Sequence, residues 1–294
     1  MQNKPNLTLV FDVIVCGSLH LDIVVQSPDL PRIDETVVGS AWKQVCGGKG
    51  GNQAVQAAAA GAKTAMISRV GKDGFADALT QNLKANGVDI SAVVADAVAG
   101  SGMSVAILKD DGDYGAVIVS GSNLKIEPAT LGAEWQRLGG ARVLVLQNEV
   151  PHAVNVAAAS AAKAAGAIVV FNAAPVRTVG QDLLSQVDVL VVNRVEAEGM
   201  SGIPVHDRAT AIAALAALRK LAKSIVITLG GAGLVVDEDG HAVEIEAQRV
   251  EVSSTHGAGD CFVGTLSQRL AQGMGLVQAC RAANLRAAEF VSRH

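Results

Sequence analysis

The stretch VLVLQNEVPHAVNVAAASAAKAAGAIVVFN, residues 143–172, contains the pattern that decides the fold. It begins with an apolar run, continues through an alanine-rich segment, and ends in a second apolar run. Continuous β-branched runs are typical of parallel strands buried on both faces, whereas Ala153–Ala165 has the composition and length of a helix. The stretch therefore predicts a strand–helix–strand unit in which Val143–Leu146 and Ile168–Asn172 run parallel.

The same alternation extends along the chain in both directions. The other strand candidates are Asp12–Cys16, Thr64–Ser68, Val187–Asn193 and Ser224–Leu229, and the other helix candidates are Asn52–Ala60, Gly74–Ala85, Arg208–Leu221 and Asp260–Gln272. Repeated strand–helix units predict an α/β fold with a parallel sheet whose two faces are covered by helices, a three-layer α/β/α sandwich.

Two segments interrupt this alternation. Residues 19–45 and about 100–120 contain short strands and turns, such as Ser104–Leu108 and Ala116–Val119 around Asp111-Gly112. Antiparallel strands inserted at these two places predict a small β-sheet beside the main body. We therefore expect a single domain over residues 1–294, with the small sheet as its lid.

Composition excludes several classes of function. The net charge is −4 and 3% of the residues are aromatic, which leaves neither a basic surface nor stacking platforms for nucleic acid. No charge-free apolar stretch of about 20 residues occurs, and Asp12 interrupts the first apolar run, so neither a membrane span nor a signal peptide is predicted. The scattered cysteines form no CxxC pair, which favours a reduced compartment. We expect a cytoplasmic protein without nucleic-acid or membrane partners.

The most informative motif is Ser254-Thr255-His256-Gly257-Ala258-Gly259-Asp260, which precedes a helical segment. Glycines at a helix start let an anion approach backbone N–H groups, and the helix dipole favours negative charge. Phosphoryl transfer to a hydroxyl needs such amides beside a fixed carboxylate, here Asp260, because the carboxylate accepts the proton of the hydroxyl. The alternative is a glycine turn in which Asp260 only caps the helix.

A second motif, Gly47-Gly48-Lys49-Gly50-Gly51-Asn52, precedes the first predicted helix. It has neither the Gly-Lys-Ser/Thr of a Walker loop nor the spacing of a dinucleotide fingerprint. It brings backbone groups, one cation and one amide to a helix start, where a polar ligand could bind. The alternative is a mobile surface turn.

Polar residues also follow several predicted strands. These residues are Asp22 in Gly17-Ser18-Leu19-His20-Leu21-Asp22, Glu149 in Gln147-Asn148-Glu149, Asn193 and Glu196 in Asn193-Arg194-Val195-Glu196, and Thr228 and Gly230 in Thr228-Leu229-Gly230-Gly231. The carboxyl ends of parallel strands meet at one edge of the sheet, where open α/β sheets bind ligands. We therefore expect these side chains to converge, although each alone could be a solvated turn residue.

Together these segments resemble the ribokinase-like, or PfkB, carbohydrate kinase family over about residues 12–293, and most closely its ribokinase branch. The motifs that carry the resemblance are Gly47–Asn52 with Gln53-Ala54, Gln147-x-Glu149, Asn172-Ala173-Ala174-Pro175, Thr228-Leu229-Gly230 and Gly257–Asp260. The resemblance implies an enzyme that phosphorylates a hydroxyl of a small sugar with ATP and Mg²⁺. It also implies a lid that closes over the sugar and a homodimer formed through that lid.

The resemblance further implies roles for single residues. Asp260 would be the general base, and the amides of Gly257, Ala258 and Gly259 would form the anion hole. The sugar would be held by His20, Asp22, Gly48, Lys49, Asn52 and Glu149, and the nucleotide by Asn193, Thr228, Gly230 and Asn284. Glu196 would position the magnesium ion through water.

Three departures from the family pattern bear on function. The family's loop usually reads Asp-Thr-Thr/Asn-Gly-Ala-Gly-Asp; here Ser254 replaces its first Asp, and His256 replaces the residue before its glycines. The sequence also stops at His294, where ribokinases continue into a loop that completes a potassium site. The changed Asp and the missing loop argue against activation by K⁺. His20 stands where ribokinases have Asn, which leaves a sugar other than ribose open.

Two other functions remain open on the sequence. A nucleoside kinase of the same family needs apolar or aromatic surfaces for the base, and the predicted lid offers Trp42 and Tyr114. A sugar-sensing protein without catalysis would account for Ser254 and the early end of the sequence. It would leave Asp260 and the neighbouring glycines without a role.

Overall fold

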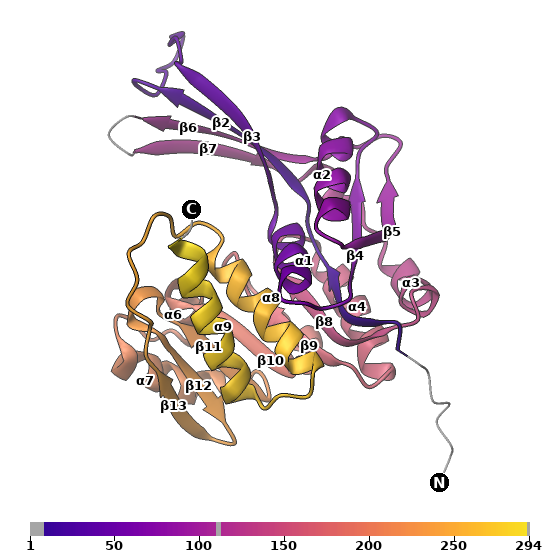
Figure 1. Cartoon of the computed structure of the whole chain (residues 1–294), viewed down its shortest axis with the longest axis vertical. Coiled ribbons are helices and arrows are strands. Elements are labelled where there is room, and N and C mark those ends of the chain that lie inside the picture. The colour runs from indigo at the N-terminus through magenta and orange to yellow at the C-terminus, as the bar shows by residue number, and fades with distance from the viewer. Residues whose placement is uncertain (1–8, 110–112, 293–294) are drawn as a thin grey trace.

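The main sheet is built from the apolar runs that predict strands. The computed structural model describes residues 9–109 and 113–292, and within them this sheet has nine strands in the order β13-β12-β11-β10-β9-β8-β1-β4-β5 (Figure 1). Its centre consists of β1 (Phe11–Cys16), β4 (Thr64–Val70), β8 (Ala141–Gln147), β9 (Ile168–Asn172), β10 (Val189–Asn193) and β11 (Ser224–Thr228). These strands pair in parallel, which confirms the predicted core of the sheet.

The two edges of the sheet differ from the prediction. The parallel strand β5 (Asp89–Ala95) extends one edge, and β12 (Leu234–Glu238) and β13 (His241–Ile245) add antiparallel strands to the other, so the sheet is mixed. The turn between β12 and β13 has positive φ at Asp239 and Gly240, 50° and 82°. An Asp-Gly pair of this kind favours a two-residue hairpin turn, so the sequence did contain a signal for these two strands.

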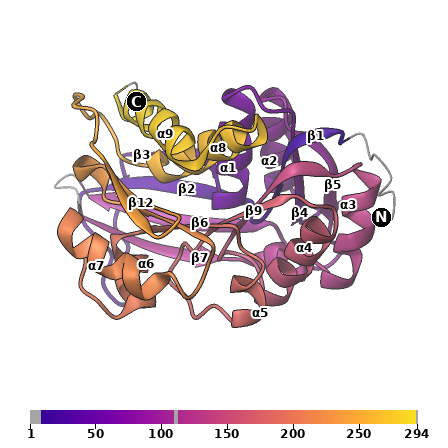
Figure 2. The same cartoon turned by 90° about the horizontal axis from the view of Figure 1, so that it is seen from below.

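Helices cover both faces of the sheet (Figure 2). One face carries α1 (Lys49–Ala59), α2 (Gly74–Ala85), α8 (Ala258–Ala271) and α9 (Leu276–Val291), and the other carries α3 (Leu131–Arg137), α4 (His152–Ala164), α5 (Gln181–Leu184), α6 (Arg194–Ser201) and α7 (Arg208–Leu218). Successive strand residues point to opposite faces, so Val13 and Val15 of β1 join one apolar core while Ile14 and Cys16 join the other. The three-layer architecture is thereby confirmed, although α3, α5, α6 and α9 were not predicted. Among the described residues, no helix has the length and apolar character that a membrane crossing requires.

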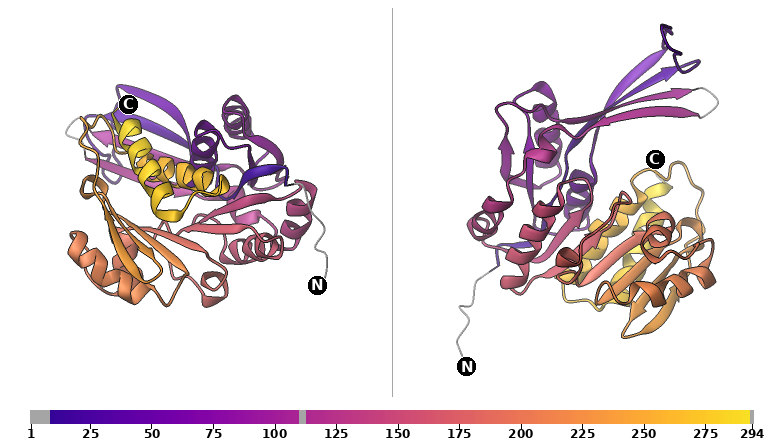
Figure 3. Two further views of the ribbon diagram at one scale, coloured as in Figure 1. Left: turned by 60° about the horizontal axis from the view of Figure 1, so that its bottom comes forward. Right: turned by 180° about the vertical axis from the view of Figure 1, so that it is seen from behind.

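A second, smaller sheet projects from the main body (Figures 1 and 3). It contains β2 (His20–Ser27), β3 (Ala41–Gly47), β6 (Gly102–Lys109) and β7 (Tyr114–Val119), in the order β3-β2-β6-β7. The pairs β2–β3 and β6–β7 are antiparallel as predicted, but β2 and β6 pair in parallel, which corrects the expectation of an antiparallel sheet. The expected turn residues Asp111 and Gly112 lie outside the described part of the chain.

Candidate active site

The carboxylate of Asp260 is buried at the start of α8, and its side chain is held by α1. Asp260 is 8% exposed. Its Oδ1 accepts a hydrogen bond from Nε2 of Gln53 at 2.9 Å, and its Oδ2 accepts one from Nδ2 of Asn52 at 3.0 Å. Burial raises the pKa of Asp260, while nearby Lys49 and the two amide donors oppose that rise and the Glu149 carboxylate adds to it. Asp260 does not act as the cap of α8, because Gly257 is the N-cap residue and α1 supplies donors to both oxygens of Asp260.

The backbone that leads into α8 has the geometry of an anion site. Gly257 precedes the helix with φ of 78°, a left-handed conformation that favours glycine. The first N–H groups of a helix have no carbonyl within the helix to bind, and they lie at the positive end of its dipole. The N–H of Ala258 already donates to the carbonyl of Thr255 at 3.2 Å. One of the three amides expected in the anion hole is thus engaged in this structure.

The glycine-rich segment packs against the chain that follows β1. Gly48 has φ of 85°, and a Cβ atom there would lie 2.8 Å from the backbone nitrogen of His20, so a larger residue does not fit. The N–H of Gly51 donates to the carbonyl of Ser18 at 2.9 Å, and the N–H of Lys49 donates to Glu149 Oε2 at 2.8 Å. Helix α1 therefore starts at Lys49, earlier than the predicted Asn52. These contacts exclude the interpretation of the segment as a mobile surface turn.

The buried His20 and the partly exposed Glu149 belong to one polar cluster. Ser18 Oγ donates to Glu149 Oε2, and His20 Nδ1 lies 3.9 Å from the same oxygen. Asn123 binds both backbone groups of Leu19, since its Oδ1 accepts from the N–H at 2.9 Å and its Nδ2 donates to the carbonyl at 2.8 Å. This fixed orientation turns Nδ2 of Asn123 toward His20 Nε2 at 3.3 Å. His20 Nε2 is therefore the acceptor, and Nδ1, which faces Glu149, carries the proton.

Asp22 lies next to this cluster on β2. Its Oδ1 accepts a hydrogen bond from Ser104 Oγ on the neighbouring strand β6. A Cβ atom at Gly47 would collide with the Asp22 carboxylate, so the glycine-rich segment lies directly against it. The structure thus brings Asp22 to the same end of the molecule as the other predicted sugar residues.

Asn193 and Glu196 form a capping box at the start of α6. Asn193 Oδ1 accepts from the N–H groups of Val195 and Glu196 at 2.8 and 3.1 Å, and Glu196 Oε2 accepts from the N–H of Asn193 at 2.7 Å. Burial raises the pKa of Glu196, and the positive charge of Lys49 opposes that rise. Lys49 therefore acts electrostatically on both Glu196 and Asp260, which links the two predicted parts of the site.

The remaining predicted nucleotide residues make local contacts. Thr228 Oγ1 lies 3.4 Å from the carbonyl of Val192, Gly230 begins the short 3₁₀ helix Gly230–Ala232, and Asn284 Nδ2 donates to the carbonyl of Glu246 at 2.8 Å. None of these hydrogen bonds joins its residue to the group around Asp260. Their expected part in nucleotide binding stays a prediction.

Several polar residues of the site received no predicted role from the sequence. Ser104 and Asn123 lie in or beside the small sheet and were missed. Gln53, Gln147 and Asn172 form a buried amide group next to Asp260, in which Gln53 Nε2 donates to Asn172 Oδ1 at 3.0 Å and Gln147 Nε2 donates to Gln53 Oε1 at 2.8 Å. Gln147 ends β8 and Asn172 ends β9, so the signal was an amide at the end of an otherwise apolar strand.

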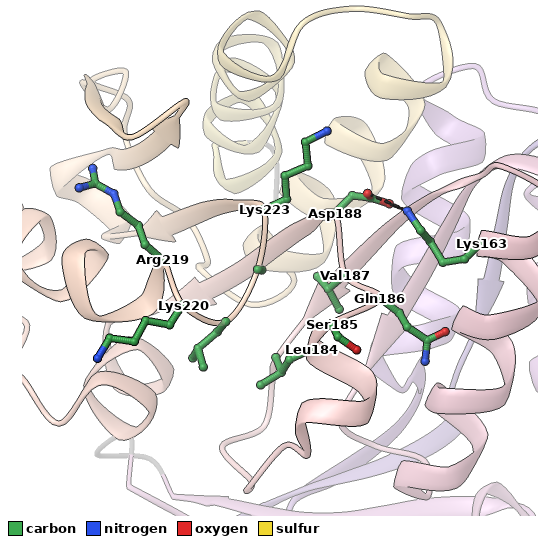
Figure 4. Close-up of a pocket in the computed structure, with 11 residues that line it drawn as sticks. Lys163, Leu184, Ser185, Gln186, Val187, Asp188, Arg219, Lys220 and Lys223 are labelled. Atoms are coloured by element: carbon green, nitrogen blue, oxygen red, sulfur yellow. Dashed lines mark hydrogen bonds and ion pairs between the residues drawn. The ribbon is translucent and has the colours of Figure 1, made fainter.

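A separate cavity of about 360 Å³ lies at the amino ends of the central strands, opposite the ends that carry the predicted site (Figure 4). It is lined by residues that precede β10 and β11, including Asp188 and Lys223, and therefore lies at the amino ends of these strands. Lys163 Nζ pairs with Asp188 at 2.8 Å, and Arg219 pairs with Asp237 at 2.9 Å. These pairings involve two of the four cations that line the cavity, and none of the predicted site residues lines it.

Known proteins are similar to this chain in both sequence and fold. Residues 10–294 match the family model described as pfkB family carbohydrate kinase. Ribokinase of Mus musculus is 34% identical over 263 residues, which cover 88% of this chain and 81% of that protein. Deoxyribokinase of Salmonella typhi is 31% identical over 286 residues, which cover 96% of this chain and 92% of that protein. The structure of Arabidopsis thaliana ribokinase complexed with ribose and ATP superposes with a TM-score of 0.89 at 28% identity, covering 96% of this chain and 92% of that one.

The close approach of α1 and α8 generates a prediction at Gly264. A Cβ atom at this position would lie 2.7 Å from the backbone nitrogen of Ala57 and 2.8 Å from the carbonyl oxygen of Gln53. Gly264→Ala will push the two helices apart, and we expect it to lower the free energy of unfolding by about 1–3 kcal/mol. Chemical denaturation measures this change.

The matched control for this prediction is Gly132→Ala in α3. A Cβ atom at Gly132 meets nothing within 4 Å, so we expect no loss of stability and a small gain in helix propensity. If both variants were equally stable, the tight contact between α1 and α8 would be contradicted.

Proposed function

The chain belongs to the pfkB family of carbohydrate kinases, and on this premise we propose that it transfers the γ-phosphoryl group of ATP to a hydroxyl of a ribose-like pentose or a related small sugar, with Asp260 as the general base. The names of the relatives support this substrate class, since they are called ribokinase and deoxyribokinase. The observation that carries the proposal is the buried Asp260 carboxylate at the N-terminus of α8, held by side chains of α1.

The proposed base can accept a proton from the sugar. Each oxygen of Asp260 accepts one hydrogen bond from α1, and each therefore keeps a lone pair for a further donor. As the sugar oxygen attacks the γ-phosphorus, its proton passes to Asp260 and the bond to the β–γ bridging oxygen breaks, which releases ADP. The raised pKa makes the carboxylate a stronger base than an exposed aspartate.

The start of α8 is the proposed anion hole. The amides of Gly257, Ala258 and Gly259 would bind the oxygens of the moving phosphoryl group, and the bond from Ala258 to Thr255 would yield to this stronger acceptor. Magnesium, when bound with ATP, neutralises charge on the phosphates. Glu196 fits a place beside it through water, because its oxygens each accept one bond from Asn193 and keep a lone pair. Asn193, Thr228, Gly230 and Asn284 are the proposed nucleotide residues.

The polar residues around the glycine-rich segment are the proposed sugar site. They supply carboxylates, amides, a cation and an imidazole, which together match the donors and acceptors of a polyhydroxylated ligand; they are His20, Asp22, Gly48, Lys49, Asn52 and Glu149. The small sheet would close over the sugar and exclude water. Its exposed residues Tyr114, Val117 and Ile118, each more than 60% exposed, support a homodimer through this sheet.

The experiment that tests the proposed function is an ATP-consumption assay with Mg²⁺ across ribose, deoxyribose, hexoses and nucleosides. We expect turnover with one class of free pentose and equal rates with and without K⁺, since Ser254 supplies no carboxylate for that ion. Turnover with nucleosides alone would favour the nucleoside kinase, for which exposed Trp42 on β3 offers a stacking surface. If sugars raised the melting temperature without turnover, the chain would be a sugar-binding protein and the kinase proposal would fail.

The role of Asp260 is tested by Asp260→Asn. Loss of a general base lowers turnover by roughly 10²- to 10⁴-fold, and we expect this loss while the affinity for the sugar, measured by calorimetry, remains. The matched control is Asp77→Asn on the exposed side of α2, which also removes one negative charge and should leave turnover unchanged. An unchanged rate in Asp260→Asn would rule out Asp260 as the base.

A further inference from the structure

The buried amide group of Gln53, Gln147 and Asn172 lies next to Oδ1 of Asp260. We propose that Gln53, oriented by Asn172 and bound by Gln147, is a positioning residue that holds Asp260 in place and maintains its negative charge during turnover. This inference rests on the proposed role of Asp260 as the base. It assigns a function to a residue that does not itself contact the substrate.

The backbone determines which way the Gln53 amide points. Asn172 Nδ2 donates to the carbonyl of Val191 on β10 at 3.2 Å, so Asn172 Oδ1 is left to accept. It accepts from Gln53 Nε2 at 3.0 Å, which directs the NH₂ group of Gln53 toward the space between Asn172 and Asp260. Its second N–H donates to Asp260 Oδ1 at 2.9 Å. The orientation of Gln53 is thus anchored to the sheet independently of Asp260.

Gln147 binds the other end of the Gln53 amide. Gln147 Nε2 donates to Gln53 Oε1 at 2.8 Å, but Gln147 Oε1 has no hydrogen-bond partner among the described residues, so Gln147 alone does not fix the orientation of Gln53. A flipped Gln53 would turn its carbonyl oxygen toward the Asp260 carboxylate, where two acceptors would repel each other. Asn172 and the Asp260 carboxylate therefore favour one orientation of the Gln53 amide, in which Asp260 faces a donor.

Gln53 differs from the other groups that face Asp260. Lys49 and Glu149 act on Asp260 through their opposite charges, and Asn52 donates to its Oδ2. Asn52 is partly exposed and is itself a proposed sugar residue, so a bound hydroxyl can compete for its amide. Gln53 is fully buried and cannot reach the sugar. When a sugar hydroxyl competes for the Asn52 amide, Oδ2 is the oxygen that loses its donor and receives the proton, while Gln53 still donates to Oδ1.

The test is Gln53→Met, a change of similar volume that removes the amide. A hydrogen bond to a charged group is worth roughly a 10- to 100-fold preference for the charged form, or about one to two pH units. We expect the acidic limb of kcat/KM against pH to move to higher pH by this amount. Turnover at neutral pH should fall and recover as the pH rises, while KM for the sugar stays near that of the unchanged chain. A loss of kcat that is equal at every pH would show a merely structural role and overturn the proposal.

Two further variants support this test. Gln147→Met removes the donor to Gln53 Oε1 without touching Asp260, and we expect a smaller shift of the acidic limb in the same direction, also if Gln53→Met fails to fold. Gln56→Met is the matched control, because Gln56 lies one turn further along α1 and should leave the pH profile unchanged.

The two proposals fail in distinguishable ways. If Asp260→Asn kept full turnover, the base would be wrong and the role of Gln53 would fall with it. If Asp260→Asn lost turnover while both Gln53→Met and Gln147→Met kept the original pH profile, only the role of Gln53 would be refuted.

Discussion

Burying the carboxylate of Asp260 removes it from water, and an ionised carboxylate without partners is costly in a protein interior. The chain offsets this cost with two amide donors from α1, the positive charge of Lys49, and the N-terminal position of Asp260 in α8, where the helix dipole favours negative charge. The amide donors and Lys49 belong to α1, so these two contributions require α1 and α8 to lie against each other, and the missing side chain of Gly264 permits that approach. The packing of two helices thus determines the chemistry of the site.

The sheet supplies the rigid part of this arrangement. Its central strands are buried on both faces by two apolar cores, and their carboxyl ends carry the polar residues that meet near Asp260. Gln147 and Asn172 are the last residues of β8 and β9, and each forms a hydrogen bond with the side chain of Gln53 on α1. The small sheet contributes differently, because its strands place Asp22 and His20 beside the glycine-rich segment.

Sequence patterns predicted the centre of the fold and singled out Asp260, which is buried at the start of α8, since both depend on local signals. Parallel strands such as β8 are continuous apolar runs, and Asp260 follows glycines at a helix start. The parallel pairing of β2 with β6 has no local signal, because the paired residues are far apart in the chain and either strand could pair otherwise. For the same reason Ser104 and Asn123, which are separated from their partners by 82 and 104 positions, could not be found from the sequence. The antiparallel edge strands were missed although Asp239-Gly240 marks their turn.

We propose above all that Asp260 lies beside the acceptor hydroxyl, whose oxygen faces the transferred phosphate. A crystal structure of the chain with the sugar that it phosphorylates and a non-hydrolysable ATP analogue tests this most directly. We expect a sugar hydroxyl within hydrogen-bond distance of Asp260 Oδ2 and a terminal phosphate bound by the backbone N–H groups at the start of α8. A sugar bound away from Asp260, or a phosphate bound elsewhere on the sheet, would contradict it.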